Sequence, residues 1–138
     1  GEEVRAEDVL GTVSANLETD VFAMIDFMSQ GRKDEAFRLL HNLFLSGEKE
    51  YRLLALICSQ LEIILSVKEM KEEGKTYSQM QEILGVHEFR IKKGAMFAGR
   101  YEMPHLRRAL IKAYEIDKNI KTGIMDGQLA LELLVVEM

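Results

Sequence analysis

The sequence predicts an all-α fold: a compact bundle of about eight helices that occupies residues 1–138 as a single domain. A chain of 138 residues is long enough for one domain with a core of its own. It contains one Pro and almost no alternating Val, Ile and Thr runs, which argues against a sheet. Its apolar residues instead recur at helical spacing, in segments joined by the short connections usual in bundles.

The longest helix is predicted at residues 48–73, a stretch without Gly or Pro. At about 1.5 Å per residue it would be roughly 39 Å long. Its apolar residues cover more than one helix face, so we expect a central helix with neighbours on several sides. They are Leu53, Leu54, Leu56, Ile57, Leu61, Ile63, Ile64 and Leu65. Cys58 lies among them and is the only cysteine, which predicts a buried, inert thiol and no internal disulfide.

Three helices are predicted before this central one. Residues 6–14 suit a short helix. The second carries the apolar run at residues 21–28, begins at a cap made by Thr19 or Asp20, and ends at Gly31. The third has two acids at positions 34 and 35 in its first turn, where the helix dipole favours them, and it ends at residues 46–47.

Four helices are predicted after the central one. Thr76 and Gln79 form a capping box before the first, which ends at Gly85. The next spans residues 87–100, and Pro104 begins the third. Asp126 caps the last helix. The residues expected to face inward in these last three are Phe89, Ile91, Met96 and Phe97, then Leu106, Leu110, Ile111, Tyr114 and Ile120, then Leu129, Leu131, Leu133, Leu134 and Val136.

Nothing in the sequence points to catalysis, a metal or a cofactor. The three histidines, His41, His87 and His105, have no second His or Cys at ligand spacing. Residues 74–76 read Gly-Lys-Thr, like the end of a phosphate loop, but Glu69 stands where that motif needs its first Gly. No Ser or Cys has the surroundings of a nucleophile elbow. No apolar run approaches the length of a membrane span, so we expect no membrane contact.

Residues 76–96 favour one alternative, a helix-turn-helix that binds nucleic acid. Gly85 would be the turn, and Met80, Leu84, Val86 and Ile91 would form its small core. Residues 90–112 hold seven cations and one acid, a local charge of +6; since the whole chain carries −5, the remainder carries −11. The candidate contacts to nucleic acid or to a partner are Arg90, Lys92, Lys93, Arg107 and Arg108.

Two details weaken this alternative. Gln81 stands four residues before Gly85, where the motif normally has a small residue because the two helices cross closely. The residues that would enter the major groove begin with His87, Glu88 and Phe89, and an acid beside a large aromatic ring reads bases poorly. A helix-turn-helix that serves only for packing, with its lysines in solvent, has the same sequence pattern.

The order and spacing of short segments along nearly the whole chain resemble one family. The segments are Val21-Phe22, Ile25-Asp26, Glu35-Ala36, Leu39-Leu40, Gly47-Glu48, Leu53-Leu54, Ser59-Gln60-Leu61, Gly85-Val86-His87, Lys92-Lys93, Ala95, Asp117, Ile120-Lys121-Thr122-Gly123 and residues 129–134. Together they are similar to the C-terminal domain of the delta subunit of the bacterial DNA polymerase III clamp loader.

This resemblance implies a non-catalytic oligomerisation domain, the C-terminal fragment of a longer subunit. In the family, such domains close a ring-shaped collar that holds the clamp loader together. The implied partners are the gamma/tau and delta-prime type subunits, with the sliding clamp and primed DNA reached only through the whole complex. The implied location is the cytoplasmic, nucleoid-associated replisome, and no cofactor is implied.

The most specific part of the resemblance is Asp117 with Lys121, Thr122 and Gly123. These residues also have a structural explanation, in which they end one helix and direct the next. Lys121 would complement the helix C-terminus, and Gly123 would adopt a left-handed cap conformation. Asp117 lies four residues before Lys121, so an ion pair along the helix is expected. Direct contact with a partner is the alternative role.

Overall fold

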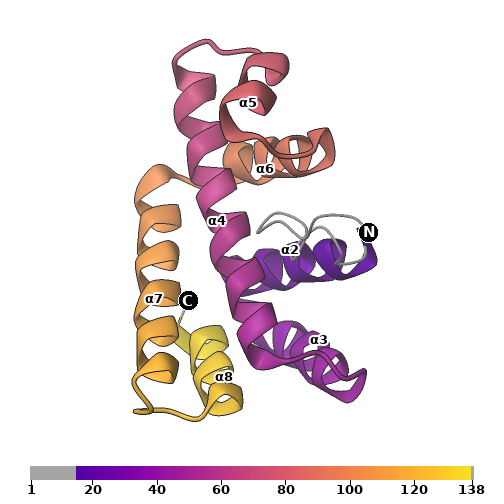
Figure 1. The fold of residues 1–138 in the computed structure, drawn as a ribbon, viewed down its shortest axis with the longest axis vertical. Helices are drawn as coiled ribbons and strands as arrows, with labels where there is room; N and C mark the ends of the chain where they lie inside the picture. Colours follow the sequence, from indigo (N-terminus) through magenta and orange to yellow (C-terminus); the bar gives the residue numbers. More distant parts are fainter. Residues whose placement is uncertain (1–14, 138) are drawn as a thin grey trace, which may run out of the picture.

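The computed structural model describes residues 15–137, which form seven helices and no strand (Figure 1). The helices are α2 (Ala15–Ser29), α3 (Lys33–Leu45), α4 (Glu50–Glu72), α5 (Tyr77–Leu84), α6 (Glu88–Arg100), α7 (Met103–Lys121) and α8 (Gly127–Glu137). The predicted all-α class is therefore confirmed. The helix predicted at residues 6–14 lies outside the described residues.

Helix α4 is the central helix of the fold, as the sequence predicted. Its 23 residues make it about 35 Å long. It packs against α2, α5, α6, α7 and α8, and in Figure 1 it runs upright between α7 on one side and α2 on the other. Eleven of its residues are buried, and they point to more than one side of the helix. One of them is polar: Gln60 is fully buried.

The core consists of three clusters of buried side chains, and α4 contributes to each. The largest cluster joins α2, α3, α4, α7 and α8, and it includes Leu61, which lies halfway along α4. The second includes Phe22, Phe97 and Leu106, packed against Ile64 of α4. The third is the predicted core of the α5–α6 pair, with Met80, Ile91, Leu84 and Val86, and it also contains Ile63 and Val67 of α4. The α5–α6 pair is therefore part of the bundle core.

Four helices end in the same way, at a glycine with positive φ. At each, the glycine N–H donates to a carbonyl three residues back and the next N–H donates to one five residues back, which is the Schellman pattern. These glycines are Gly31, Gly47, Gly74 and Gly123. The predicted helix ends at all four positions are confirmed.

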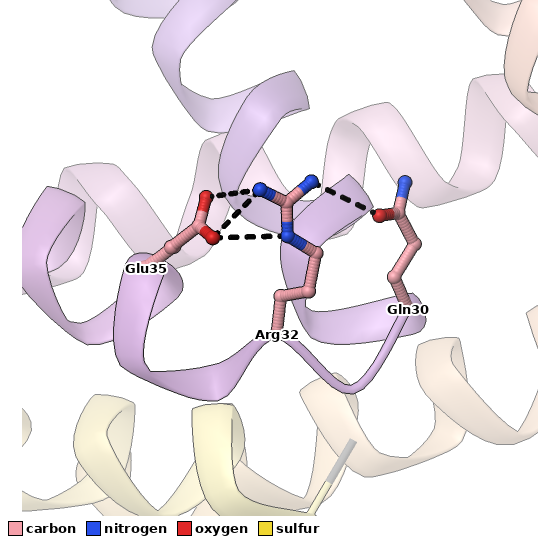
Figure 2. A network of polar contacts seen from close by, with 3 residues as sticks. All are labelled: Gln30, Arg32 and Glu35. Atoms are coloured by element: carbon pink, nitrogen blue, oxygen red, sulfur yellow. Dashed lines mark hydrogen bonds and ion pairs between the residues drawn. The ribbon is translucent and has the colours of Figure 1, made fainter.

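The turn between α2 and α3 is held by Arg32 (Figure 2). Its guanidinium donates from Nε and Nη2 to the Glu35 carboxylate, with a shortest distance of 2.6 Å, and from Nη1 to Gln30 Oε1 at 3.4 Å. It also lies 4.9 Å from the centre of the Phe27 ring. These contacts bridge the turn that links α2 to α3.

The predicted caps of α5 and α8 are confirmed, α7 begins at Met103, one residue before the predicted Pro104, and the predicted start of α2 is wrong. In the capping box, Gln79 N–H donates to Thr76 Oγ1 at 3.2 Å and Thr76 N–H donates to Gln79 Oε1 at 2.8 Å. Asp126 caps α8 through a 3.2 Å bond from the Leu129 N–H. Helix α2, however, begins at Ala15, so Thr19 and Asp20 lie inside it and are not its caps. Because α2 begins before Leu17, this residue is part of the helix, and its side chain is buried in the core.

Some residues predicted to face inward are exposed. Ile111 and Tyr114 of α7 are 58% and 46% exposed. The buried residues of α7 are Leu106, Ala109, Ala113 and Ile116, and the predicted Leu110 and Ile120 pack against the core while partly exposed. Alanines allow α7 to lie close to α4, so a narrow stripe of the helix suffices for packing. The same correction applies to Phe89 and Met96 of α6 and to Leu129 and Val136 of α8, all of which are more than a third exposed.

Candidate functional site

The end of α7 carries the residues that the sequence singled out. Asp117 Oδ2 lies 2.7 Å from Lys121 Nζ, which confirms the expected ion pair. Thr122 Oγ1 donates to the Lys118 carbonyl at 2.8 Å. Gly123 has φ +74°, and its N–H donates to Ile120 O at 3.1 Å. Together these contacts form the end of α7, from which the chain turns into α8.

The same part of α7 lies beside α4. Tyr114 Oη donates to Glu62 Oε1 at 2.7 Å, and this bond raises the pKa of Tyr114 to about 12, because ionisation would place a second negative charge beside the carboxylate. Cys58 is buried between these residues, and burial, followed by the charges of Asp117 and Glu62, raises the pKa of its thiol to about 12. The thiol is therefore protonated at neutral pH, as expected for an inert cysteine.

The five candidate basic residues do not form one surface. Arg90 is used inside the domain: its guanidinium lies 2.6 Å from Glu18 Oε1 of α2, and both side chains are only 12% exposed. Lys92 lies on the outer side of α6 and pairs with Glu88 at 3.1 Å. Lys93 is also on α6, with its ammonium 5.9 Å from the centre of the Phe89 ring.

The remaining two candidates, Arg107 and Arg108, lie exposed on α7. Neither guanidinium is paired with a carboxylate within residues 15–137. The five candidates are thus divided into an internal ion pair made by Arg90, a group on α6 and a group on α7. Only the two exposed groups present cations that a partner could reach.

One polar network was missed in the sequence. Asp26 of α2 accepts a hydrogen bond from Tyr101 Oη, and it forms an ion pair with Arg100, whose Nη1 lies 2.8 Å from Asp26 Oδ2. The Tyr101 ring stacks between Phe97 and His105, with centroid distances of 6.4 and 5.4 Å. Burial, and then the bond to Asp26, raises the pKa of Tyr101 to about 12. The network ties the α6–α7 corner to α2 across 75 residues of chain, a separation that no local pattern reveals.

Neither a metal-binding cluster nor a membrane-spanning helix is present in the described part of the chain. No group of three or more His, Cys, Asp or Glu between residues 15 and 137 is arranged to hold a metal ion. Among the seven helices described, none has both the length and the apolar character that crossing a membrane requires.

The fold, together with the exposed side chains of α6 and α7, defines an all-helical domain that has apolar and charged helix faces open to solvent. The chain belongs to the family of the DNA polymerase III delta subunit, C-terminal domain, whose family model matches residues 18–138. It is 30% identical to the Bacillus subtilis (strain 168) DNA polymerase III subunit delta over 137 residues. The family is a component of the clamp loader that serves DNA replication, as the sequence resemblance implied.

A solved structure supports the same membership. The structure of the Bacillus subtilis DNA clamp loader delta protein superposes with a TM-score of 0.82 and 30% identity, over 99% of this chain. The chain spans 40% of the length of this relative and of the curated one. The comparison therefore concerns one domain of those longer proteins.

Proposed function

We propose that this domain is the oligomerisation (collar) domain of a clamp-loader delta subunit. It holds the subunit beside neighbours of the gamma/tau and delta-prime type and takes no catalytic part itself. Sliding clamp and primed DNA are reached through the whole complex, in the cytoplasm at the replisome. This role is finer than family membership and is the function that the domain's construction supports best.

The observation that carries the proposal is the likeness to a clamp loader delta protein over 99% of this chain. The construction of the domain agrees with a holding role, because all three core clusters include residues of α4. A helix shared by every cluster makes the domain one rigid body. Exposed apolar side chains such as Ile111 and Tyr114 then remain for contacts with neighbours.

The test is assembly with the other clamp-loader subunits of the same organism. The full-length protein that contains this domain is mixed with them at micromolar concentration and the products are separated by size. We expect a stable complex, and we expect it to be lost when residues 15–137 are deleted. A full-length protein that does not associate, or that associates equally well without the domain, would contradict the proposal.

The second candidate function is nucleic-acid binding by α5 and α6. The observation in its favour is the Gly85 turn, with φ +66° between two short helices that share a core. Titration with fluorescent duplex DNA at low and moderate salt separates the two functions. An affinity that is high, falls steeply with salt and is greater for one DNA sequence would favour the helix-turn-helix hypothesis.

A further inference from the structure

The outward side of α7 combines apolar and cationic side chains in one continuous line. Its members are four, three, four and three residues apart, so they lie above one another along the helix. They are Arg107, Ile111, Tyr114, Lys118 and Lys121, and all five are exposed. We call them the α7 stripe. The two apolar members are adjacent at its centre, and more than two fifths of each is exposed.

One member of the centre of the α7 stripe, Tyr114, is hydrogen-bonded to the neighbouring helix. Tyr114 is held by the 2.7 Å bond from its hydroxyl to Glu62 of α4, which leaves the ring at the surface with a fixed direction. An exposed aromatic ring that is held in place loses little conformational freedom when a partner packs against it. Tyrosine and arginine are also the residue types that most often dominate binding energy at interfaces.

Cations lie at both ends of the α7 stripe. Arg107 is at one end beside Arg108, and Lys118 and Lys121 are at the other. Lys121 is paired with Asp117, but its side chain is still 72% exposed. The centre, made of Ile111 and of Tyr114 with its bond to the Glu62 carboxylate, lies between two cationic ends and complements an amphipathic helix that is acidic on both sides of its apolar residues. A nucleic-acid phosphate backbone would pair with the cations, but it would place negative charge against the apolar side chains of Ile111 and Tyr114.

We propose that the α7 stripe is a docking surface for a neighbouring clamp-loader subunit, and that its occupant is an amphipathic helix of that subunit with an apolar centre and acidic flanks. The inference rests on the proposed collar function. It adds the face of the domain that is used and the chemistry of the partner, neither of which follows from family membership.

The first test compares two exposed isoleucines in the full-length protein. Ile111→Asp places a charge at the centre of the α7 stripe. Ile83→Asp, on α5, is the matched control, because Ile83 is 55% exposed and Ile111 is 58% exposed. Affinity for the purified clamp-loader subunits is measured by titration. We expect Ile111→Asp to weaken it about tenfold or more, and Ile83→Asp to leave it unchanged.

The second test reverses charge and also guards against a folding defect in the first. The double variant Arg107→Glu, Arg108→Glu should weaken association and make it less sensitive to salt, whereas Arg38→Glu on α3 should do neither. Circular dichroism and the thermal midpoint establish that each variant is folded.

The outcomes separate this inference from the proposed function. If the wild type associates and both α7 variants, once folded, bind as tightly as it does, the docking surface is wrong and the collar function stands. If the wild type does not associate at all, both are wrong. If the α7 variants keep subunit affinity and lose affinity for duplex DNA instead, the stripe serves nucleic acid and the docking proposal is overturned.

Discussion

Arg90 and Glu18 form a largely buried ion pair between α6 and α2. Two guanidinium nitrogens, Nη2 and Nε, lie 2.6 and 2.7 Å from the same oxygen, Glu18 Oε1, and each side chain is 12% exposed. The Glu18 carbonyl accepts a hydrogen bond from Gln60 Nε2 at 3.2 Å, so helices α2, α4 and α6 meet around one polar contact. The pair is thus part of what positions α6 on the bundle.

We expect Arg90→Ala to lower the free energy of unfolding by about 2–4 kcal/mol, because it leaves the Glu18 carboxylate without its partner in a site that water barely reaches. Lys92→Ala is the matched control. Lys92 pairs with Glu88, but both side chains are about 60% exposed, so the change should stay within about 0.5 kcal/mol. Urea denaturation measures both, and equal midpoints for the two variants would show that the buried pair contributes nothing.

Leu61→Ala should lower the free energy of unfolding by about 2–5 kcal/mol, because Leu61 is fully buried in the largest cluster and its truncation leaves a cavity. Leu45 provides the contrast: it is 80% exposed at the end of α3, and Leu45→Ala should cost about 0.5 kcal/mol or less. The measurement is the midpoint of urea denaturation, compared between variants whose unfolding free energies have the same dependence on urea concentration. An unaffected Leu61→Ala protein would mean that this face of α4 is misplaced.

Stability should fall as the solution becomes alkaline, between pH 10 and about 12. The pKa of Tyr101 rises from 10.0 to about 12 on folding, so above pH 10 the unfolded chain loses this proton first and the free energy of unfolding decreases. The phenol's contribution is complete below pH 10 and lost as pH rises through about 12. Thermal midpoints across this range should fall less steeply for Tyr101→Phe than for the wild type. Identical slopes would exclude Tyr101 as a source of the pH dependence.

Gly123→Ala should destabilise the domain by about 1–2 kcal/mol, since alanine is strained at φ +74°. Gly99→Ala tests whether the effect comes from the backbone conformation. Gly99 is helical and exposed, and an added Cβ there meets no atom within 4 Å, so alanine should raise stability by about 0.5 kcal/mol. Opposite shifts of the two thermal midpoints are expected, and shifts of the same sign would contradict the explanation.

Features set by neighbouring residues could be predicted from the sequence. The capping box of Thr76 with Gln79, the Asp117–Lys121 pair and the glycine helix ends each involve residues five or fewer positions apart. Their geometry follows from helix structure alone. The central position of α4 was also predictable, because a helix that is apolar on several sides must be covered on several sides.

Features that join distant segments could not be predicted in this way. Glu18 and Arg90 are 72 residues apart, and Asp26 and Tyr101 are 75 apart, so no sequence spacing pairs them. The exposed faces were missed for another reason. An apolar residue at helical spacing is equally consistent with the core of its own domain and with an open surface, and Ile111 is an example of the second.

The participation of α4 in all three clusters has a mechanical consequence. Every cluster would lose residues if α4 unfolded, so we expect neither end of the domain to loosen while the other stays intact, and unfolding to be a single transition. A displacement applied where α5 and α6 pack would be transmitted along α4 to α8, which packs against the other end of this helix (Figure 1). Anything attached at opposite ends would accordingly move in step.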